Sequence, residues 1–344
     1  MKRNELISKF SKLGFFLQPD LLNFLLENPE KIERVVEEIK KRKITQKFLS
    51  LNLFPSLQTK EIRVKVIKKL EKKEKVSVDN LVEMLSSRYK KLQKFLIKRM
   101  ELTNLLSINK ISPRSKKFSI IGLVREIDEE LNSITLEDLT GEINLKVENV
   151  SDLVEDEVIG VVCERRGDDI FAIKILHPDI PTYREIGKSK EEIKILISSF
   201  LPKKIETISF DILWILKYKD QIKVKPENLK FFCFDENVTD PSLIEINGVK
   251  FFISSGKFLK EYEKKFNLPK LKTLLKMLKK RHLNPKISEE NLNEIFLLDV
   301  LPDVIVVKGE KTDFLNYKGI TLICCGEKGV LINLKTRDVL KIDV

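Results

Sequence analysis

The sequence predicts a multidomain α+β protein with a helical N-terminal region, a small β-barrel and a layered α/β sandwich. Its 344 residues exceed the roughly 100 to 200 residues of one domain. Apolar residues recur at helical spacing near the N-terminus, and from Phe118 onward the apolar pattern changes to a period of two. The predicted domains are therefore 1–50 (helical), 51–117 (a basic linker and helical region), 118–180 (the barrel) and 181–344 (the sandwich).

The first 50 residues have the spacing of short amphipathic helices. Leu6 and Phe10 fall on one helical face, and Pro29 stands where a first helical turn accepts proline. In residues 62–67, the apolar Ile62, Val64 and Val66 alternate with Arg63, Lys65 and Ile67, which predicts one strand. The charged run 68–75 is expected to form a linker or an exposed loop.

A longer helix is predicted after Ser77, whose hydroxyl can cap the first turn. At ~100° per residue, one apolar stripe forms along this helix. Its members are Leu81, Leu85, Tyr89, Leu92, Leu96 and Met100. The opposite face carries ammonium groups, which can displace counterions from nucleic-acid phosphates. These DNA-binding candidates are Lys90, Lys91, Lys94 and Lys98, and the alternative is an ordinary solvated lysine face.

Residues 118–180 predict about five short strands joined by tight turns. Their number and lengths suit an oligonucleotide-binding-type (OB-type) β-barrel. Such barrels often bind single strands through aromatic and cationic side chains, but Phe118 and Phe171 are the only aromatic residues of this segment. The segment also has 5 Lys and Arg against 16 Asp and Glu. A scaffold or protein-docking role is therefore favoured over single-strand binding.

Residues 181–344 mix strands and helices. Continuous apolar runs such as 304–307 are typical of buried central strands, and Asn247-Gly248 predicts a hairpin turn. The expected strands are 193–198, 231–234, 242–246, 249–253, 304–307, 320–323, 330–333 and 339–342. The expected helices are 210–218, which carries the single tryptophan Trp214, and 271–281. Together these elements predict a layered α/β sandwich.

The net charge of +12 is unevenly distributed along the chain. Residues 1–117 have 29 Lys and Arg against 13 Asp and Glu, hence +16, whereas 118–180 carry −11 and 181–344 carry +7. A basic end joined to an acidic middle fits a protein that contacts nucleic acid with one region and another protein with the next. The alternative is a general Lys and Glu bias on every surface, as in thermophiles.

Composition excludes several classes of protein. Apolar runs are far shorter than the ~20 residues of a membrane span, and basic residues interrupt the N-terminus, so a cytoplasmic location without membrane contact is expected. The four cysteines show no disulfide or metal-ligand spacing. Because His177 and His282 are the only histidines, a metal centre with three or more imidazoles is excluded.

Several short motifs, in colinear order over about 60–344, resemble the small subunit of the archaeal family D DNA polymerase. They are RYKKL at 88–92, SIIGLV at 119–124, LEDLTG at 136–141, DEVIG at 156–160, PDIP at 178–181, DPSLIEINGVK at 240–250, RHLNP at 281–285, VLPD at 300–303 and YKG at 317–319. Each motif is weak alone, but their order is specific. The resemblance implies a helical N-terminal domain, an OB-type barrel, and a calcineurin-like, metallophosphoesterase-type α/β sandwich.

In that family the phosphodiesterase domain resembles a two-metal 3′–5′ exonuclease, which needs carboxylates and imidazoles at strand ends. Here the aligned positions lack metal ligands. They are Ser199 and Leu201 for the family's Asp-x-His, Ser255 for its Tyr-His-Gly, and Gly309 and Lys311 for its Gly-His-x-His. None of these side chains is a useful ligand for Mn²⁺ or a similar ion. The comparison therefore predicts a sandwich without catalytic residues, metal ligands or cofactors.

Two other family motifs are also altered. The Gly-Asn-His-Asp motif falls on 235–238, with sequence DENV. The Gly-Asp motif has no expected counterpart, because about a dozen residues between the predicted helix 210–218 and the strand 231–234 are too few for a strand, a loop and a helix. One alternative is a carboxylate-only metal site built from Asp235, Glu236, Asp299 and Asp303, although carboxylates at loop ends are usually solvated or capping.

His282 and three cysteines are the other reactive side chains of the sandwich. His282 belongs to the RHLNP motif, where a structural role is favoured over contact with a partner or DNA. Cys233, Cys324 and Cys325 lie within strand patterns, so they are expected to be buried thiols and not nucleophiles.

The resemblance implies a regulatory or scaffolding small subunit of a replicative DNA polymerase D complex, with the family's 3′–5′ exonuclease activity lost. Its implied partners are the large catalytic subunit and DNA. Two alternatives remain open. One is an active metal-dependent 3′–5′ exonuclease with a non-standard ligand set, and the other is an independent single-stranded-DNA-binding protein, which the acidic barrel disfavours.

Overall fold

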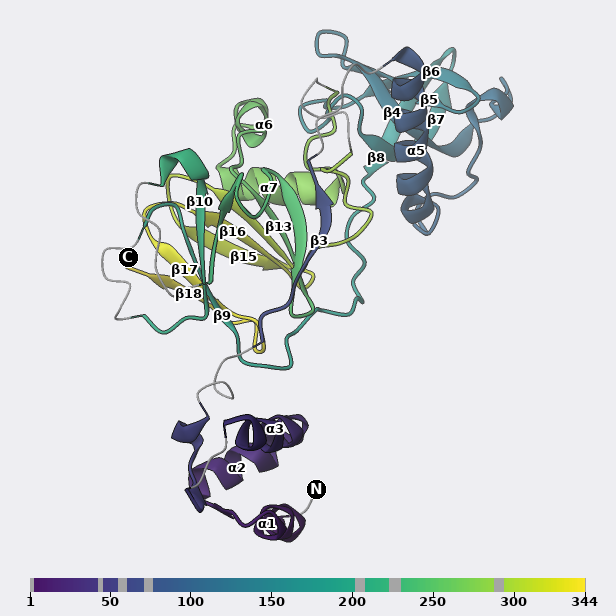
Figure 1. Ribbon diagram of the computed structural model, residues 1–344. Coiled ribbons are helices and arrows are strands. Elements are labelled where there is room, and N and C mark those ends of the chain that lie inside the picture. Colours follow the sequence, from purple (N-terminus) through teal and green to yellow (C-terminus); the bar gives the residue numbers. More distant parts are fainter. Residues whose placement is uncertain are drawn as a thin grey trace. The chain divides into compact units, whose positions relative to one another are not determined.

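The computed structural model describes residues 3–42, 46–54, 61–70, 77–201, 208–222, 230–287 and 294–343, excepting the side chains of Lys41, Arg42 and Asn52. Over these residues the protein is a mixed α+β structure with several sheets and one closed barrel (Figure 1). The chain divides into two compact units, Met1–Ile62 and Arg63–Val344. Each unit has apolar cores of its own.

The first unit is a small helical module, as the apolar spacing predicts. Its elements are α1 (Arg3–Lys12), β1 (Phe16–Leu17), α2 (Pro19–Glu27), η1 (Pro29–Lys31), α3 (Ile32–Arg42), β2 (Phe48–Leu49) and η2 (Leu51–Leu53). Leu6, Phe10 and Leu25 belong to one buried cluster. The helices therefore pack through the apolar stripes that predict them, while β1 and β2 form a short parallel pair.

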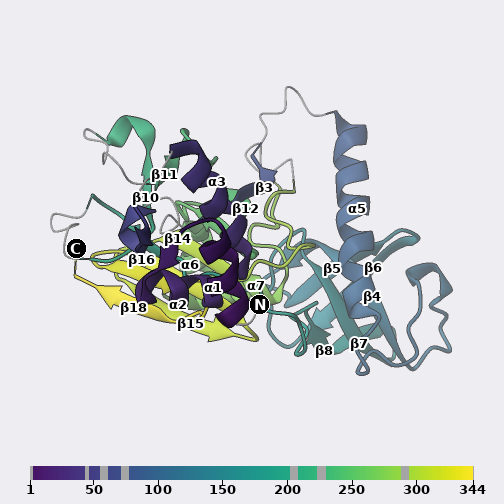
Figure 2. The same ribbon diagram turned by 60° about the horizontal axis from the view of Figure 1, so that its bottom comes forward.

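The second unit contains the long helix α5 (Val78–Leu96), which lies beside the barrel in Figure 2. The Ser77 hydroxyl accepts a hydrogen bond from Asn80 N at 3.3 Å, so the predicted cap is confirmed. Tyr89 and Leu92 pack against the barrel in a shared core cluster. Met100, however, is 91% exposed, so its predicted place in the buried stripe is wrong. The helix ends at Leu96, and helical spacing no longer orients the side chains that follow.

The predicted five-stranded barrel is present and closed. Its strands are β4 (Lys117–Asp128), β5 (Ser133–Asp138), β6 (Gly141–Val147), β7 (Val158–Arg166) and β8 (Asp169–Leu176), in the order β4-β5-β6-β8-β7. Only β6 and β8 pair in parallel within this barrel. Gly160 lets β7 approach Leu102 closely, because a Cβ at this position would lie 2.7 Å from Leu102 Cδ1.

The sandwich contains two mixed sheets. The five-stranded sheet, in order, is β11 (Lys230–Phe234), β10 (Ile212–Tyr218), β9 (Lys194–Ser198), β17 (Gly329–Asn333) and β18 (Val339–Ile342). The six-stranded sheet is β15 (Asp313–Tyr317), β16 (Ile320–Cys325), β14 (Val304–Lys308), β13 (Val249–Ser254), β12 (Ser242–Ile246) and β3 (Val64–Lys69). The strands predicted from the apolar runs of this region are therefore confirmed, and β15 is an additional one.

Alternating side chains of β13 show how the layers stack. Phe251 contacts Trp214 of the five-stranded sheet, with ring centroids 6.3 Å apart. Phe252 belongs instead to the core cluster that includes Leu274 and Met277 of α7 (Lys270–Lys279). The six-stranded sheet thus packs between the five-stranded sheet and the helices α6 (Leu259–Phe266) and α7, an arrangement that Figure 1 also shows. The layered sandwich and the helix predicted for 271–281 are confirmed.

The helix predicted for 210–218 is wrong. This segment forms the strand β10, which pairs in parallel with β9 on one side and β11 on the other. Residues 212–216, including Trp214, are all buried. A continuous apolar run buried on both faces has no periodicity that separates a central strand from a buried helix. Pairing with β9 and β11, and not a local pattern, therefore makes residues 212–218 a strand.

Two local predictions for the six-stranded sheet are confirmed. Asn247 and Gly248 have φ values of 45° and 85°, and they connect the antiparallel strands β12 and β13. The strand predicted for 62–67 is β3, which pairs with β12. Of the linker predicted for 68–75, two residues belong to β3, and 71–76 lie outside the described residues. Within the described part of the chain, no helix is long and apolar enough to span a membrane.

Candidate functional site

The carboxyl ends of several parallel strands meet at one edge of the sandwich. Ser199, just after β9, donates a hydrogen bond from Oγ to the carbonyl oxygen of Cys325, the last residue of β16, at 2.7 Å. Lys257, shortly after β13, donates from Nζ to the hydroxyl of Tyr218 at the end of β10, at 3.2 Å. Because these bonds join the two sheets, the chain segments aligned with the exonuclease motifs lie together at this edge.

Three aligned positions hold groups that are poor metal ligands. The Ser199 hydroxyl is buried and committed to a backbone carbonyl, and Leu201 is apolar and partly exposed. Ser255 donates its backbone N–H to Asp240 Oδ1 at 2.8 Å. A neutral hydroxyl and an aliphatic side chain cannot replace the carboxylates and imidazoles that bind divalent ions.

The other two aligned positions follow β14. Gly309 donates its amide to the carbonyl oxygen of Cys325 at 2.9 Å. A Cβ at Gly309 would lie 2.1 Å from Cys324 Sγ, so this backbone leaves no room for a side chain. Lys311 is exposed, and its ammonium group would repel a nearby cation. The residues at this edge therefore do not fit the metal pair that the family resemblance implies.

Asp240 organises the edge, and the sequence analysis missed this role. Its carboxylate accepts hydrogen bonds from the Tyr218 hydroxyl at 2.5 Å, from Ser254 Oγ at 2.8 Å and from the amide of Ser255. Burial raises the pKa of Tyr218, and the Asp240 carboxylate adds to the shift. Three donors use the oxygens of Asp240, so this group joins β10 to β13 as a structural link.

The predicted absence of a Gly-Asp counterpart assumed a helix at 210–218, and that assumption is wrong. The segment forms the strand β10, and residues 223–229 between it and β11 lie outside the described residues. Tyr218 ends the strand, and the turn η5 (Lys219–Gln221) follows with an exposed Asp220. The hydroxyl of Tyr218 is bonded to Asp240.

The four carboxylates of the alternative metal site are dispersed. Asp235 and Glu236 are exposed after β11. Asp299 forms ion pairs with Lys68 and, at 3.4 Å, with Lys91. Asp303 is buried and accepts hydrogen bonds from the Arg184 guanidinium and two backbone amides. Among the residues that the structure describes, no three His, Cys, Asp or Glu side chains are grouped so as to hold a metal ion.

His282 is fully buried beside Glu294. The amide of Asn284 donates to His282 Nδ1 at 3.3 Å, so this ring nitrogen is an acceptor and the imidazole is neutral. His282 Nε2 lies 3.5 Å from Glu294 Oε2. Burial lowers the pKa of His282 to about 4, and the Arg88 guanidinium adds to the effect. These contacts support the structural role favoured for this histidine.

The cysteines are buried thiols. Burial raises the pKa of Cys163 and of Cys325 to about 12, and that of Cys324 to about 11. Cys233 is also buried, and its thiol lies 3.4 Å from a carboxylate oxygen of Glu236. A thiol held in its protonated form is a poor nucleophile, so these buried cysteines fit a packing role in the core.

The lysine candidates of α5 differ from one another. Lys90 and Lys94 are exposed on the helix, and Lys98 is exposed in the turn after it. Lys91 is partly buried and lies 3.4 Å from Asp299, so its charge is partly neutralised within the chain. Lys90, Lys94 and Lys98 are therefore the three members of the predicted face that present their ammonium groups to solvent.

Two buried cations that the sequence analysis did not single out tie the barrel to the sandwich. Arg88 donates to Glu294 Oε1 at 3.0 Å and to the carbonyl oxygens of Asp156 and Pro285 at 2.9 and 2.6 Å. Lys280 contacts both carboxylate oxygens of Glu157, at 2.7 and 2.9 Å. Arg88 is the first residue of the RYKKL motif, and Glu157 belongs to the DEVIG motif. Their positions in these two motifs were the sequence signal that could have identified them.

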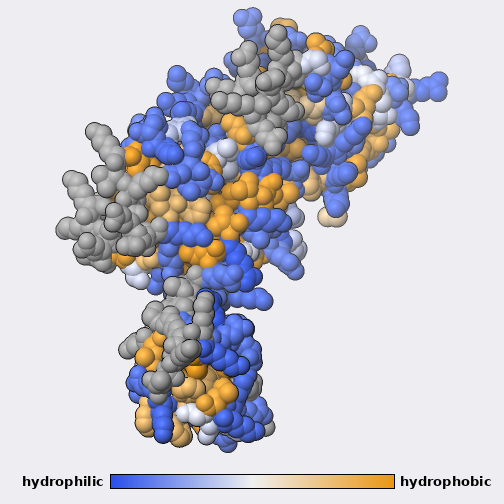
Figure 3. Space-filling model, in the orientation of Figure 1, coloured by the Kyte–Doolittle hydropathy of each residue, from blue (hydrophilic) through white to orange (hydrophobic). Residues whose placement is uncertain are grey.

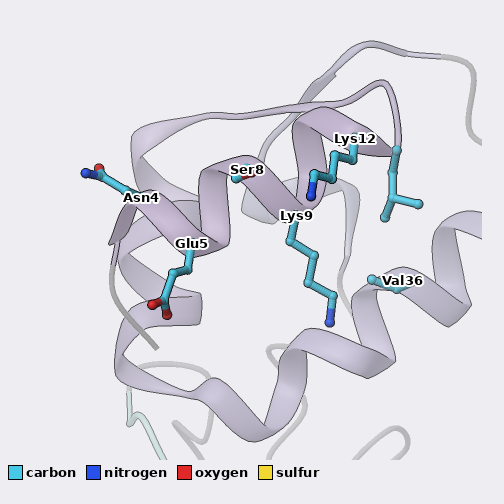
Figure 4. Close-up of a pocket in the computed structure, with 7 residues that line it drawn as sticks. Asn4, Glu5, Ser8, Lys9, Lys12 and Val36 are labelled. Carbon is cyan, nitrogen blue, oxygen red and sulfur yellow. The ribbon is translucent and has the colours of Figure 1, made fainter.

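The first unit has a groove of its own, about 590 Å³ in volume, between α1 and α3 (Figure 4). Asn4, Ser8, Lys9 and Lys12 of α1 line it, and Val36 of α3 forms part of the opposite wall. Lys9 is already paired with Glu33. The lining residues include no imidazole, thiol or paired carboxylates, so the groove has no arrangement for catalysis.

The fold defines a class of multidomain α+β protein in which a closed barrel is joined to a two-sheet sandwich. At the carboxyl edge of the sandwich, the strand ends carry hydroxyl, amide and ammonium groups. No protein-family model matches the chain. Several curated proteins, however, match parts of it. The chain is 33% identical to the DNA polymerase II small subunit of Methanothermobacter thermautotrophicus over 119 residues, which are 31% of this chain and 25% of the relative.

Two further archaeal relatives carry the same name. The small subunit from Archaeoglobus fulgidus is 27% identical over 218 residues, 57% of this chain and 40% of the relative. The one from Pyrococcus furiosus is 32% identical over 143 residues, 37% of this chain and 23% of the relative. The chain is similar, over part of its length, to these archaeal DNA polymerase small subunits, in agreement with the motif resemblance. The matches span about a quarter to two fifths of the relatives' length.

Proposed function

We propose that this chain is the non-catalytic, scaffolding small subunit of an archaeal family D DNA polymerase and binds a large catalytic subunit. Four relatives named as DNA polymerase small subunits support the assignment. The barrel order β4-β5-β6-β8-β7, with one parallel pair, supports an OB-type barrel. The two facing mixed sheets with helices outside support a calcineurin-like sandwich.

The observation that carries the non-catalytic assignment is the carboxyl edge of the sandwich. A two-metal phosphodiesterase stabilises the attacking and leaving oxygens through ions held by charged or imidazole ligands. Here Ser199 and Gly309 are bonded to the backbone, Leu201 is apolar, and Lys311 is cationic. These groups can neither hold the ions nor generate a metal-bound hydroxide.

The purified chain should therefore show no Mn²⁺- or Mg²⁺-dependent 3′–5′ degradation of end-labelled single-stranded DNA, because no ligand set activates water at this edge. The measurement is product length on a denaturing gel, with and without EDTA. Asp235→Asn and Asp303→Asn variants are the controls for a non-standard site. Metal-dependent digestion that either variant abolishes would show that the chain is an active nuclease.

We further propose that Lys90, Lys94 and Lys98 contact DNA phosphates in the assembled polymerase. Lys90 and Lys94 are exposed on α5 and Lys98 is exposed in the turn after it, and each phosphate contact releases about one counterion. Replacing the three lysines with glutamate should weaken binding regardless of DNA sequence. It should also reduce the slope of log K against log salt by roughly one for each lysine that binds a phosphate. Fluorescence anisotropy over a salt series measures both quantities.

A charge reversal elsewhere provides the control for this prediction. Lys264 is exposed on α6, so Lys264→Glu changes the net charge by the same amount per residue without altering the α5 face. That variant should keep the wild-type salt slope. Equal slopes for the α5 variant and the wild-type complex would instead assign the three lysines to a solvated face.

A further inference from the structure

The N-terminal half of α5 exposes apolar side chains beside the barrel. Val78 is 77% exposed and Val82 is 58% exposed, one helical turn apart on the same face. Leu139, at the turn between β5 and β6, is 56% exposed. Figure 3 shows hydrophobic residues among hydrophilic ones over the barrel and α5, in the upper right of the view. An exposed group of this kind is typical of an interaction site.

A pocket of about 100 Å³ opens between α5 and the barrel at this place. Its apolar wall is formed by Val82, Leu85, Leu123 and Leu139, and its other lining residues are Ser86, Tyr89, Arg125, Glu137 and Asp138. The Tyr89 hydroxyl donates to the carbonyl oxygen of Ile121 at 3.1 Å, so the polar end of this ring is already satisfied. Because a cavity of roughly 150 Å³ holds a benzene-sized molecule, this pocket suits a single aliphatic side chain.

Glu137 and Asp138 are the carboxylates that line the pocket, and other acidic side chains follow on neighbouring positions. Glu137 and Glu142 are directly opposite each other on β5 and β6, an unfavourable pairing of like charges. Arg125 is paired with Glu137 at 2.8 Å, whereas Glu142 is exposed. On α5, Asp79 and Glu83 are exposed beside Val82. The rim therefore favours a ligand that brings positive charge.

We propose that this pocket receives an aliphatic side chain from a basic segment of the polymerase large subunit, with the surrounding carboxylates pairing its cations. The inference rests on the proposed function and places one anchor point of that complex. Nucleic acid does not fit this site, because its phosphates would meet Asp79, Glu83 and Glu142. α5 thus has two halves, an acidic and apolar half that docks protein and the later half with Lys90 and Lys94.

Val82→Asp should weaken the complex with the large subunit by about tenfold or more, because it places a carboxylate among the apolar side chains that would bury the partner's aliphatic group. The two full-length subunits are coexpressed, and their affinity is measured by biolayer interferometry. Glu142→Lys should slow association, and the effect should diminish at high salt. Leu131→Asp is the matched control, since Leu131 is 73% exposed at another turn of the barrel.

The outcomes separate this inference from the function it rests on. If the wild-type chain binds the large subunit and Val82→Asp binds equally well, the pocket is not an anchor, while the scaffolding function stands. If the wild-type chain does not bind the large subunit, the proposed function fails and the inference fails with it. If Val82→Asp weakens DNA binding and not subunit binding, the site contacts nucleic acid and the inference is overturned. Far-ultraviolet circular dichroism confirms that each variant is folded.

Discussion

Replacing Lys280 with methionine should destabilise the unit Arg63–Val344 by about 3–5 kcal/mol, the usual effect of breaking a buried ion pair. Lys280 and Glu157 are both fully buried, and the ammonium group also donates to the carbonyl oxygen of Asp152 at 2.7 Å. Burial alone would raise the pKa of Glu157, but Lys280 and His177 hold it at about 2. Without Lys280, a buried carboxylate would have to stay charged without its cation or take up a proton. Urea unfolding followed by tryptophan fluorescence measures the loss.

Lys276 of α7 provides a control, one turn before Lys280, which caps the end of that helix. Lys276 pairs with Asp152, whose side chain is largely exposed, so Lys276→Met should cost about 1 kcal/mol or less. The double variant Lys280→Met with Glu157→Gln should recover part of the loss, since it removes both charges and keeps an acceptor for the amide of Val154. A Lys280→Met variant no less stable than Lys276→Met would show that the pair does not hold the barrel to the sandwich.

Mild acid should also destabilise this unit, by up to roughly 3 kcal/mol between pH 6.5 and 4. Burial and Arg88 lower the folded-state pKa of His282 to about 4, below its ordinary value of 6.5. As the pH falls, His282 therefore takes up a proton in the unfolded chain before it does so in the folded protein. The stabilisation is complete above pH 6.5 and is lost as the pH falls toward 4. Around the ring, Lys68 and Arg88 oppose protonation, and Glu294 favours it.

The two histidines of the chain allow a matched comparison. His282→Gln should flatten the dependence of unfolding free energy on pH between 6.5 and 4, whereas His177→Gln should retain it. Glu157 and Glu294, both with a pKa of about 2, contribute mainly below pH 4.5, so the comparison uses the slope above that pH. Chemical unfolding at half-unit pH steps gives the curves. If His282→Gln and the wild-type protein have the same slope, the buried imidazole is not the acid-sensitive group.

Local patterns in the sequence were sufficient for much of the fold. The Ser77 cap, the Asn247-Gly248 turn and the period-two strands of the barrel each depend on a few neighbouring residues. β10 was predicted wrongly because residues 212–216 are apolar without interruption, and only pairing with β9 and β11 distinguishes strand from helix there. β15 was not predicted, because it is an edge strand that pairs only with β16 and its side chains are mostly half-exposed.

The sequence alone was enough to indicate the resemblance to the polymerase small subunits and to predict a helical region, a barrel and a sandwich, because residue identity and spacing carry that information. The tertiary structure alone decided which polar groups meet. Lys280 and Glu157 are separated by 123 residues, and Arg88 reaches Glu294 across 206. The pocket beside α5 likewise combines side chains of α5, β4, β5 and the turn after β5. A one-dimensional pattern shows that a side chain is charged or apolar, but its burial and its partner are set by how distant segments pack.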